Sequence, residues 1–151
     1  MVDINKIKEL RELTGVGLTD AKKALQDAEG DFDKALEQMR KKGLTKAEKR
    51  SGREARAGVI GTYNHDSKIG VVVEVNCETD FVARNELFTE LVKNIAMQIA
   101  ASKPKDGKEL LAQPYIKNLD QTVEEYIKEN IAKLGENIVV RGFSRMALGE
   151  G

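Results

Sequence analysis

The sequence contains one histidine and one cysteine, His65 and Cys77, the side chains best suited to acid–base, nucleophilic or metal chemistry. A zinc site needs about three or four His, Cys or carboxylate ligands at suitable spacing, and a covalent triad needs a nucleophile beside a base. Neither pattern surrounds these residues, and no GxGxxG or GxxxxGK[ST] motif is present. We therefore predict that the chain is not an enzyme and has no catalytic residue, metal site or cofactor. His65 is expected at the surface and Cys77 as a small buried hydrophobe.

Residues 76–88, NCETDFVARNELF, place an acidic residue and an aromatic residue where a strand gives way to a helix. The preceding run, IGVVVEV, predicts a largely buried strand, and apolar residues then recur at helical spacing up to about Ser102. Thr79 or Asp80 is a natural N-cap for this helix. Phe81 either folds under the sheet as core, which the pattern alone favours, or projects at the tip. A projecting phenylalanine can enter the pocket of a partner while Asp80 fixes the register.

The first 43 residues are predicted to form a compact three-helix domain. Apolar residues line one face of residues 4–13, Thr19 can cap a second helix, and Asp31 can cap a third. Glycine-containing turns separate the helices, because glycine readily adopts the left-handed conformation that tight turns need.

This three-helix domain resembles a ubiquitin-associated domain, whose short loops expose a few apolar residues to protein partners. The corresponding residues are Val16 and Leu18, between the first two helices. Arg11 lies on the outer face of the first helix, where it is either an anchoring charge for a partner or an ordinary exposed arginine.

Residues 44–57 are predicted to form a basic, solvated helical linker. Residues 40–56 carry eight basic residues against two glutamates, but no aromatic residue lies among them to stack on bases. Over the whole chain 25 Lys and Arg balance 25 Asp and Glu, so no general field attracts nucleic acid. Direct binding to nucleic acid is not expected.

Residues 58–151 are predicted to form a small α+β core with an antiparallel sheet and packed helices. A hairpin of residues 58–65 and 69–76 is joined by Asp-Ser-Lys, and residues 136–148 resemble a third strand. A helix capped by Asp120 or Thr122 is expected to stop at Gly135, and residues 108–119 are ambiguous. So small a sheet leaves an edge to cover, which predicts a homodimer.

No apolar stretch approaches the roughly 20 residues of a membrane span, and the N-terminal residues lack the apolar core of a signal peptide. We therefore expect no membrane association and a cytoplasmic location.

The chain resembles the bacterial elongation factor Ts family, and the TDFVARN motif after a strand is highly specific for it. The matching segments span nearly the whole chain in the expected order: KELRELTGVGLTDAKKAL (8–25), GDFDKALEQMRKKG (30–43), EVNCETDFVARNELF (74–88) and, more weakly, GTYNHDSKIGV (61–71) and KLGENIVVR (133–141).

This resemblance implies a guanine-nucleotide exchange factor for elongation factor Tu. The first helix and the loop after it would contact the GTP-binding domain of the partner, and Thr79 to Val82 would bind near its magnesium ion. Within that segment, Asp80 and Phe81 would be a wedge that disturbs the ion and the phosphate-binding loop and so promotes GDP release. The resemblance assigns the other contacts to Arg11, Leu18 and Thr19 in the first region and to Tyr63 and His65 in a second.

Two departures from the family bear on this interpretation. Longer members carry two copies of the core motif, whereas this sequence has one, so a symmetric homodimer would supply the second half. The chain is also short between Pro104 and Gln113, where relatives carry a helical insertion. The competing hypothesis is an adaptor with a ubiquitin-associated-like domain, a nucleic-acid-binding linker and a structural dimer core.

Overall fold

The computed structural model describes residues 3–14 and 18–150 of the chain. Its N-terminal part contains the three expected helices: α1 (Ile4–Thr14), α2 (Leu18–Asp27) and α3 (Phe32–Arg50). Leu10 and Leu25 are fully buried between them, and several of the other buried positions are alanines, which let short helices approach closely. Between α2 and α3 the chain turns through left-handed conformations at Glu29 and Gly30.

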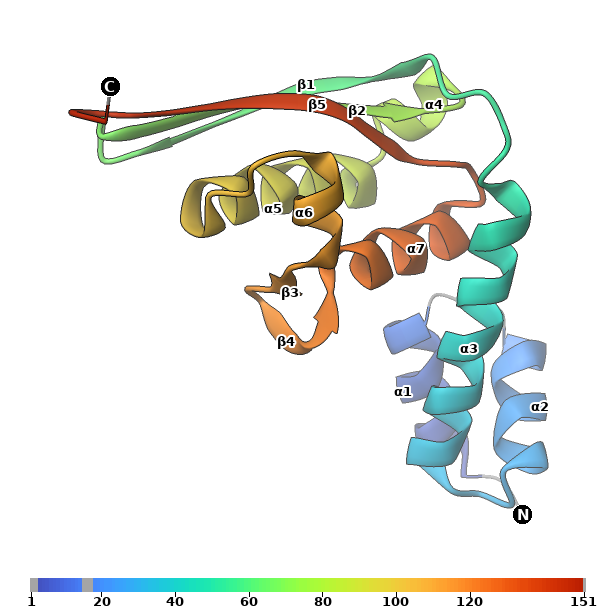
Figure 1. The fold of residues 1–151 in the computed structure, drawn as a ribbon. Coiled ribbons are helices and arrows are strands. Elements are labelled where there is room, and N and C mark those ends of the chain that lie inside the picture. The colour runs from blue at the N-terminus through green and yellow to red at the C-terminus, as the bar shows by residue number, and fades with distance from the viewer. Residues whose placement is uncertain (1–2, 15–17, 151) are drawn as a thin grey trace.

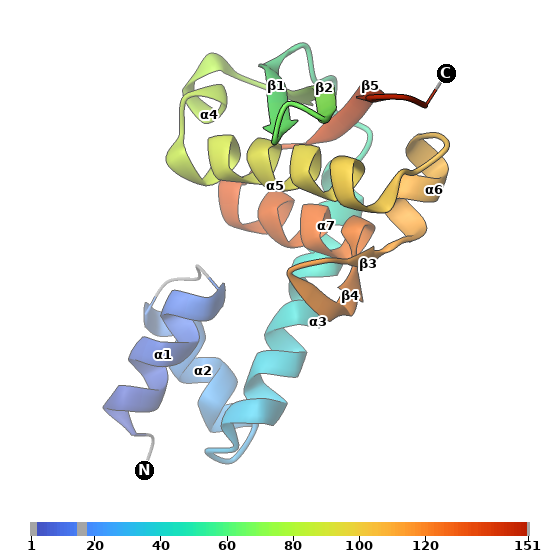
Figure 2. The same cartoon turned by 90° about the vertical axis from the view of Figure 1, so that its left-hand side faces the viewer.

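Helix α3 continues without a break from the third predicted helix into the basic segment as far as Arg50, and residues 51–56 are not helical. It is 19 residues long and lies beside α7 (Val123–Leu134) in both views of the fold (Figures 1 and 2). The Arg50 guanidinium donates a hydrogen bond of 3.3 Å to the carbonyl oxygen of Ile131, and Arg40 pairs with Glu129 at 4.0 Å. The basic segment therefore contacts the core at Arg40 and Arg50, whereas the sequence predicted a solvated helical linker.

The core has a three-stranded antiparallel sheet in the order β1-β2-β5, which confirms the predicted α+β class. Its strands are β1 (Ala57–His65), β2 (Ile69–Cys77) and β5 (Val139–Ala147), and the predicted three-residue loop joins β1 to β2. Gly58 lies opposite Asn76 with a φ of 144°, and a Cβ at this position would collide with the Val75 carbonyl oxygen. Only glycine, which has no Cβ, fits this close approach of β1 to β2.

Helices cover one face of the sheet. Figure 1 shows α5 (Glu86–Ser102) directly beneath it, α6 (Gly107–Ala112) at about the same level as α5, and α7 further below. The core side chains are fully or almost fully buried and come from alternate positions of β2 and one face of α5: Val71, Val73, Val75, Phe88, Leu91, Ile95 and Ile99. The opposite face, called the outer sheet face below, carries the exposed apolar residues Ile60, Val72 and Met146.

The structure resolves the ambiguous segment 108–119 and the two ends of α7. The ambiguous segment contains α6 and a small hairpin of β3 (Pro114–Tyr115) and β4 (Asn118–Thr122). Of the two proposed caps for α7, Thr122 is the N-cap and forms a reciprocal capping box with Glu125, whereas Asp120 lies in β4. Gly135 ends α7 with a φ of 78°, as predicted.

The helix expected from Phe81 to Ser102 is two helices. A short helix α4 (Asp80–Ala83) ends at Arg84, and Asn85 then caps α5 by accepting a hydrogen bond of 2.8 Å from the Leu87 amide. The single-helix prediction was wrong because an asparagine at an N-cap competes with continued helix.

Candidate functional site

Phe81 projects into solvent at the end of the central strand. Its exposed fraction is 83%, so the core position that the hydrophobic pattern favoured was wrong. The break at Asn85 explains the difference, because it separates the helical phase of α4 from that of α5. Ala83 is the core contact of α4, and Phe88 fills the space beneath the sheet.

The turn that carries Phe81 begins with Thr79, which is the N-cap of α4. Its hydroxyl oxygen accepts a hydrogen bond of 3.4 Å from the Val82 amide, and Asp80 follows it with an exposed carboxylate. The Arg84 guanidinium carbon lies 5.9 Å from the centroid of the Phe81 ring, within the range of a cation–π contact. The turn thus presents an aromatic ring, a carboxylate and a guanidinium on one short helix.

The loop after α7 is joined to this turn by two glutamates, Glu136 on the loop and Glu78 just before the turn. The Glu136 carboxylate accepts hydrogen bonds from the amides of Glu78 and Thr79 at 3.1 and 3.0 Å, and from the Thr79 hydroxyl at 2.7 Å. In return, the Glu78 carboxylate accepts one of 2.8 Å from the Asn137 amide. We call these four residues the glutamate clasp. Sequence reasoning missed it, because its halves lie 57 to 59 residues apart and have no local spacing signal.

The buried Cys77 thiol lies next to the clasp and donates a hydrogen bond of 3.2 Å to the Thr79 carbonyl oxygen. Its exposed fraction is 0%, which confirms the predicted burial. Burial first, and then the negative charge of Glu136, raises the pKa of the Cys77 thiol above its ordinary value. Cys77 is thus a protonated packing residue with a weak donor role.

Tyr63 and His65 form a separate surface at the hairpin end of the sheet. The tyrosine hydroxyl lies 3.0 Å from His65 Nδ1, and the two rings are stacked with centroids 6.0 Å apart. His65 is exposed, as predicted. Since β2 has nine residues and starts opposite His65, this pair is about 26 Å from the Phe81 end of the strand. Figure 1 shows the hairpin loop and α4 at opposite ends of the sheet.

The residues predicted to bind a partner in the N-terminal helices are exposed. Arg11 lies in the last turn of α1, and Leu18 and Thr19 begin α2, with Leu18 exposed to 52%. Val16 lies outside the described residues. The predicted site residues therefore occupy three regions of the surface: the N-terminal helices, the hairpin end and the Phe81 turn.

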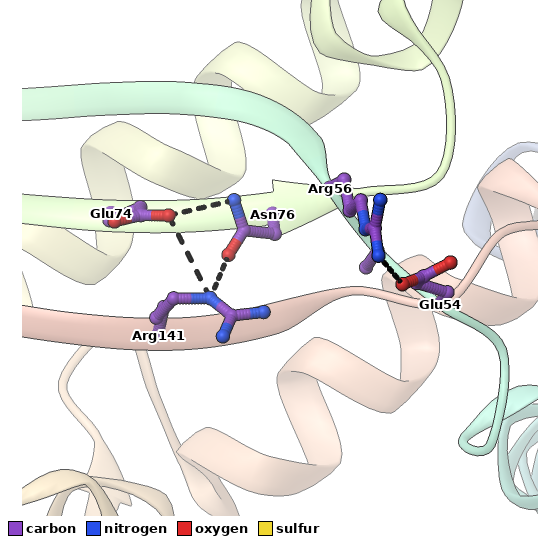
Figure 3. Close-up of a pocket in the computed structure, with 6 residues that line it drawn as sticks. Glu54, Arg56, Glu74, Asn76 and Arg141 are labelled. Atoms are coloured by element: carbon purple, nitrogen blue, oxygen red, sulfur yellow. Dashed lines mark hydrogen bonds and ion pairs between the residues drawn. The ribbon is translucent and has the colours of Figure 1, made fainter.

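A polar pocket lies where the segment before β1 crosses the sheet (Figure 3). Arg56 pairs with Glu54 at 2.6 Å, and Arg141 pairs with Glu74 at 3.8 Å. The buried Asn76 accepts a hydrogen bond of 2.8 Å from Arg141 and donates one of 3.0 Å to Glu74. These opposite charges pair with one another, so the pocket offers no surplus charge for an anion or a cation.

The described ranges, 3–14 and 18–150, contain no group of three or more His, Cys, Asp or Glu residues arranged to hold a metal ion. Within the same residues, no helix is long and apolar enough to cross a membrane.

Comparison with known proteins gives one consistent result. A family model described as Elongation factor TS matches residues 78–151, a range that contains the Phe81 turn and the whole glutamate clasp. Elongation factor Ts of Rippkaea orientalis (strain PCC 8801 / RF-1) is 46% identical over 197 aligned residues, covering 99% of this chain and 79% of the relative. The chloroplastic elongation factor Ts of Rhodomonas salina is 45% identical, covering 99% and 90%.

Elongation factor Ts of Moorella thermoacetica (strain ATCC 39073 / JCM 9320) is 43% identical and is aligned with all of this chain and 97% of its own length. Its alignment of 197 positions exceeds the 151 residues of this chain by 46, so the relative has sequence with no counterpart here. The identity and the coverage of both partners show that the chain belongs to the elongation factor Ts family.

Proposed function

We propose that this chain is a guanine-nucleotide exchange factor that acts on the GTPase elongation factor Tu. The observation that carries the proposal is the exposure of Phe81, at 83%, on a capped turn that directly follows the central strand. A phenylalanine this exposed buries little area within the fold, so its ring remains available to anchor a partner. Membership in the elongation factor Ts family supports a role in translation elongation.

An exchange factor of this kind needs no catalytic residue and forms no covalent bond. It binds the nucleotide-free GTPase more tightly than the nucleotide-bound form, and bound nucleotide must weaken its binding by the same factor. Insertion of Phe81 beside Asp80 would displace groups that hold the magnesium ion and the β-phosphate. Because magnesium neutralises phosphate charge, its displacement weakens nucleotide retention. Rebinding of GTP would then expel the Phe81 turn.

The other exposed surfaces would supply docking energy. We assign Arg11, Leu18 and Thr19 to contacts with the GTP-binding domain, and Tyr63 and His65 to a second contact region. In this scheme residues 1–43 are a ubiquitin-associated-like docking domain, residues 44–57 are a basic linker, and residues 58–151 are the core. Thr79 and Val82 flank the inserted pair in the partner contact.

We also propose that two copies of the chain associate through the outer sheet face. Ile60, Val72 and Met146 are 59%, 49% and 78% exposed there, and the sheet register places their strands side by side. These apolar side chains lie on three adjacent strands among the polar residues Thr62, Glu74 and Ser144, and such a mixed surface suits contact with a second protein. A symmetric pair would present two Phe81 turns, which would replace the second core repeat of longer family members.

We propose that the protein acts in the cytoplasm. We expect no direct contact with nucleic acid, because the formal net charge of the chain is zero. The experiment that tests the function is stopped-flow release of fluorescent GDP from elongation factor Tu, with and without this protein. Acceleration that saturates with protein concentration is the expected result. A release rate equal to the intrinsic rate at every concentration would contradict the proposal.

A further inference from the structure

We propose that Glu136 is a positioning residue that orients the Phe81 turn for insertion into its partner. This inference rests on the exchange function proposed above, because it concerns the turn that would enter the GTPase. It also makes a claim about the free protein that is tested without any partner.

The contacts of Glu136 converge on the residues immediately before Phe81. Its carboxylate binds two consecutive amides, those of Glu78 and Thr79, and the Thr79 hydroxyl, all between 2.7 and 3.1 Å. Hydrogen bonds to an ionised carboxylate are shorter and stronger than those between neutral groups. One side chain therefore fixes the backbone at the point where β2 ends and α4 begins.

The same carboxylate sets the orientation of the α4 cap. The Thr79 hydroxyl has one hydrogen, and its donation to Glu136 leaves an oxygen lone pair for the Val82 amide at 3.4 Å. Without Glu136 this hydrogen would seek another acceptor and the hydroxyl would rotate. Phe81 lies between the cap residue and Val82, so its direction depends on this bond.

Glu136 is itself held in place by the rest of the clasp. The next residue, Asn137, is 3% exposed, and its side-chain amide donates to the carbonyl oxygens of Ser51 and Arg53 at 3.3 and 2.7 Å. Its backbone amide donates to Glu78, which also lies 3.7 Å from the Arg53 guanidinium. The loop that carries Glu136 is thus tied to the segment after α3, and this anchorage makes Glu136 a fixed support.

A fixed turn presents Phe81 in one direction before the partner arrives. Without the three hydrogen bonds the Phe81 ring would still be present, but it would point in the direction needed for insertion in only a fraction of the molecules. Docking through the N-terminal helices would be unchanged. The expected consequence is a lower exchange rate at saturation with an unchanged half-saturating concentration.

The test compares three full-length variants. Glu136→Ala removes all three acceptor contacts, whereas Glu136→Gln retains a carbonyl oxygen for the two amides, both of which bind the same atom, Oε1, of Glu136. Glu125→Ala is the matched control, because the Glu125 carboxylate likewise accepts from a backbone amide and a threonine hydroxyl, those of Thr122. It lies at the far end of α7, away from Phe81.

The first measurement is amide hydrogen exchange of the free proteins, followed by NMR. We expect the Glu78 and Thr79 amides to exchange at least tenfold faster in Glu136→Ala than in the parent, and to be largely protected in Glu136→Gln. In Glu125→Ala they should exchange as in the parent. Unchanged protection of both amides in Glu136→Ala would overturn the proposal. If Glu136→Ala fails to fold, Glu136→Asp, which shortens the side chain by one methylene, takes its place.

The second measurement is GDP release from elongation factor Tu at increasing factor concentration. We expect Glu136→Ala to lower the saturating rate about tenfold with less than a twofold change in half-saturation, and Glu136→Gln to recover most of the rate. An equal loss of rate in Glu136→Ala and Glu125→Ala would mean a merely structural role and would overturn the proposal. Failure of the parent to accelerate release would instead refute the exchange function, while the hydrogen exchange result would still decide whether Glu136 orders the turn.

Discussion

Replacing Phe81 by alanine should abolish most exchange activity while leaving the fold intact. The side chain is 83% exposed, so its transfer from water into a partner remains almost wholly available for binding. Full burial of a phenylalanine is worth about 1.5 to 3 kcal/mol, and the exposed share of that is about 2 kcal/mol. If this energy is realised only as nucleotide leaves, its loss lowers the saturating rate by about 30-fold.

The same exposure predicts a small effect on stability. Phe81→Ala removes the contact with Arg84, worth about 0.5 to 1 kcal/mol at an exposed site. Phe88→Ala is the matched control, because Phe88 is fully buried beneath the sheet and its truncation should cost about 3 to 5 kcal/mol. In a domain of this size, about 1 kcal/mol lowers Tm by about 2 to 4 °C.

The assay is stopped-flow release of fluorescent GDP at saturating factor, combined with thermal unfolding of the parent and both variants. Phe81→Ala should lower Tm by less than about 4 °C, and Phe88→Ala by about 6 °C or more. A Tm loss in Phe81→Ala equal to that in Phe88→Ala would refute the assignment of Phe81 as a free partner contact. An unchanged saturating rate would refute its insertion as the cause of nucleotide release.

Three further outcomes are expected. Arg11→Ala should raise the half-saturating concentration several-fold by removing a docking charge, without lowering the saturating rate of GDP release; a lower saturating rate would contradict that division. Val72→Asp should convert a dimer into a monomer in sedimentation equilibrium, because it places an unpaired charge between Ile60 and Met146 at the proposed contact; a parent that is already monomeric would refute the dimer. Native Cys77 should react with iodoacetamide at pH 8 at least a hundredfold more slowly than the unfolded chain, because burial hides the thiol and raises its pKa, and rapid labelling seen by mass spectrometry would contradict this. The sign of the same shift means that Cys77 contributes its full stability below the thiol's ordinary pKa and that this contribution is lost as the pH rises above it.

Local patterns predicted most elements of the fold. The hairpin of β1 and β2 follows from β-branched runs on either side of a short polar loop, and α7 follows from a threonine cap at one end and Gly135 at the other. These signals lie within a few residues of the structure that they specify. For the same reason, the burial of Cys77 at a strand end could be predicted from the sequence.

The orientation of Phe81 could not be predicted in this way. Helical periodicity joined it to Leu87 and Leu91, and nothing short of the Asn85 cap shows that the helix breaks between them. The resemblance to the elongation factor Ts family gave the opposite expectation, a projecting ring, and the observed exposure agrees with it. The two predictions for Phe81 disagreed because hydrophobic spacing shows where apolar residues occur but not in which direction each side chain points.

The glutamate clasp shows a different limit. Glu78 and Glu136 each look like an ordinary surface glutamate in the sequence, and their exchange of hydrogen bonds arises only when α7 returns the chain to the end of β2. A contact between residues 57 apart depends on the path of the chain. Such a contact cannot be predicted from a single sequence, because propensity and periodicity describe only residues a few positions apart.

Because α3 is one continuous helix, it fixes the rotation of the N-terminal helices about its axis relative to the core. At about 1.5 Å per residue, its 19 residues form a strut of about 28 Å, and Arg50 fastens its far end to α7. Each residue along such a strut turns the attached domain by about 100°. Insertion of a single residue would therefore swing Arg11 and Leu18 around the helix axis relative to Phe81, whereas seven residues, close to two turns, would nearly restore their alignment and lengthen the strut by about 10 Å. The linker thus sets both the distance and the angle at which the two ends of the molecule meet a common target.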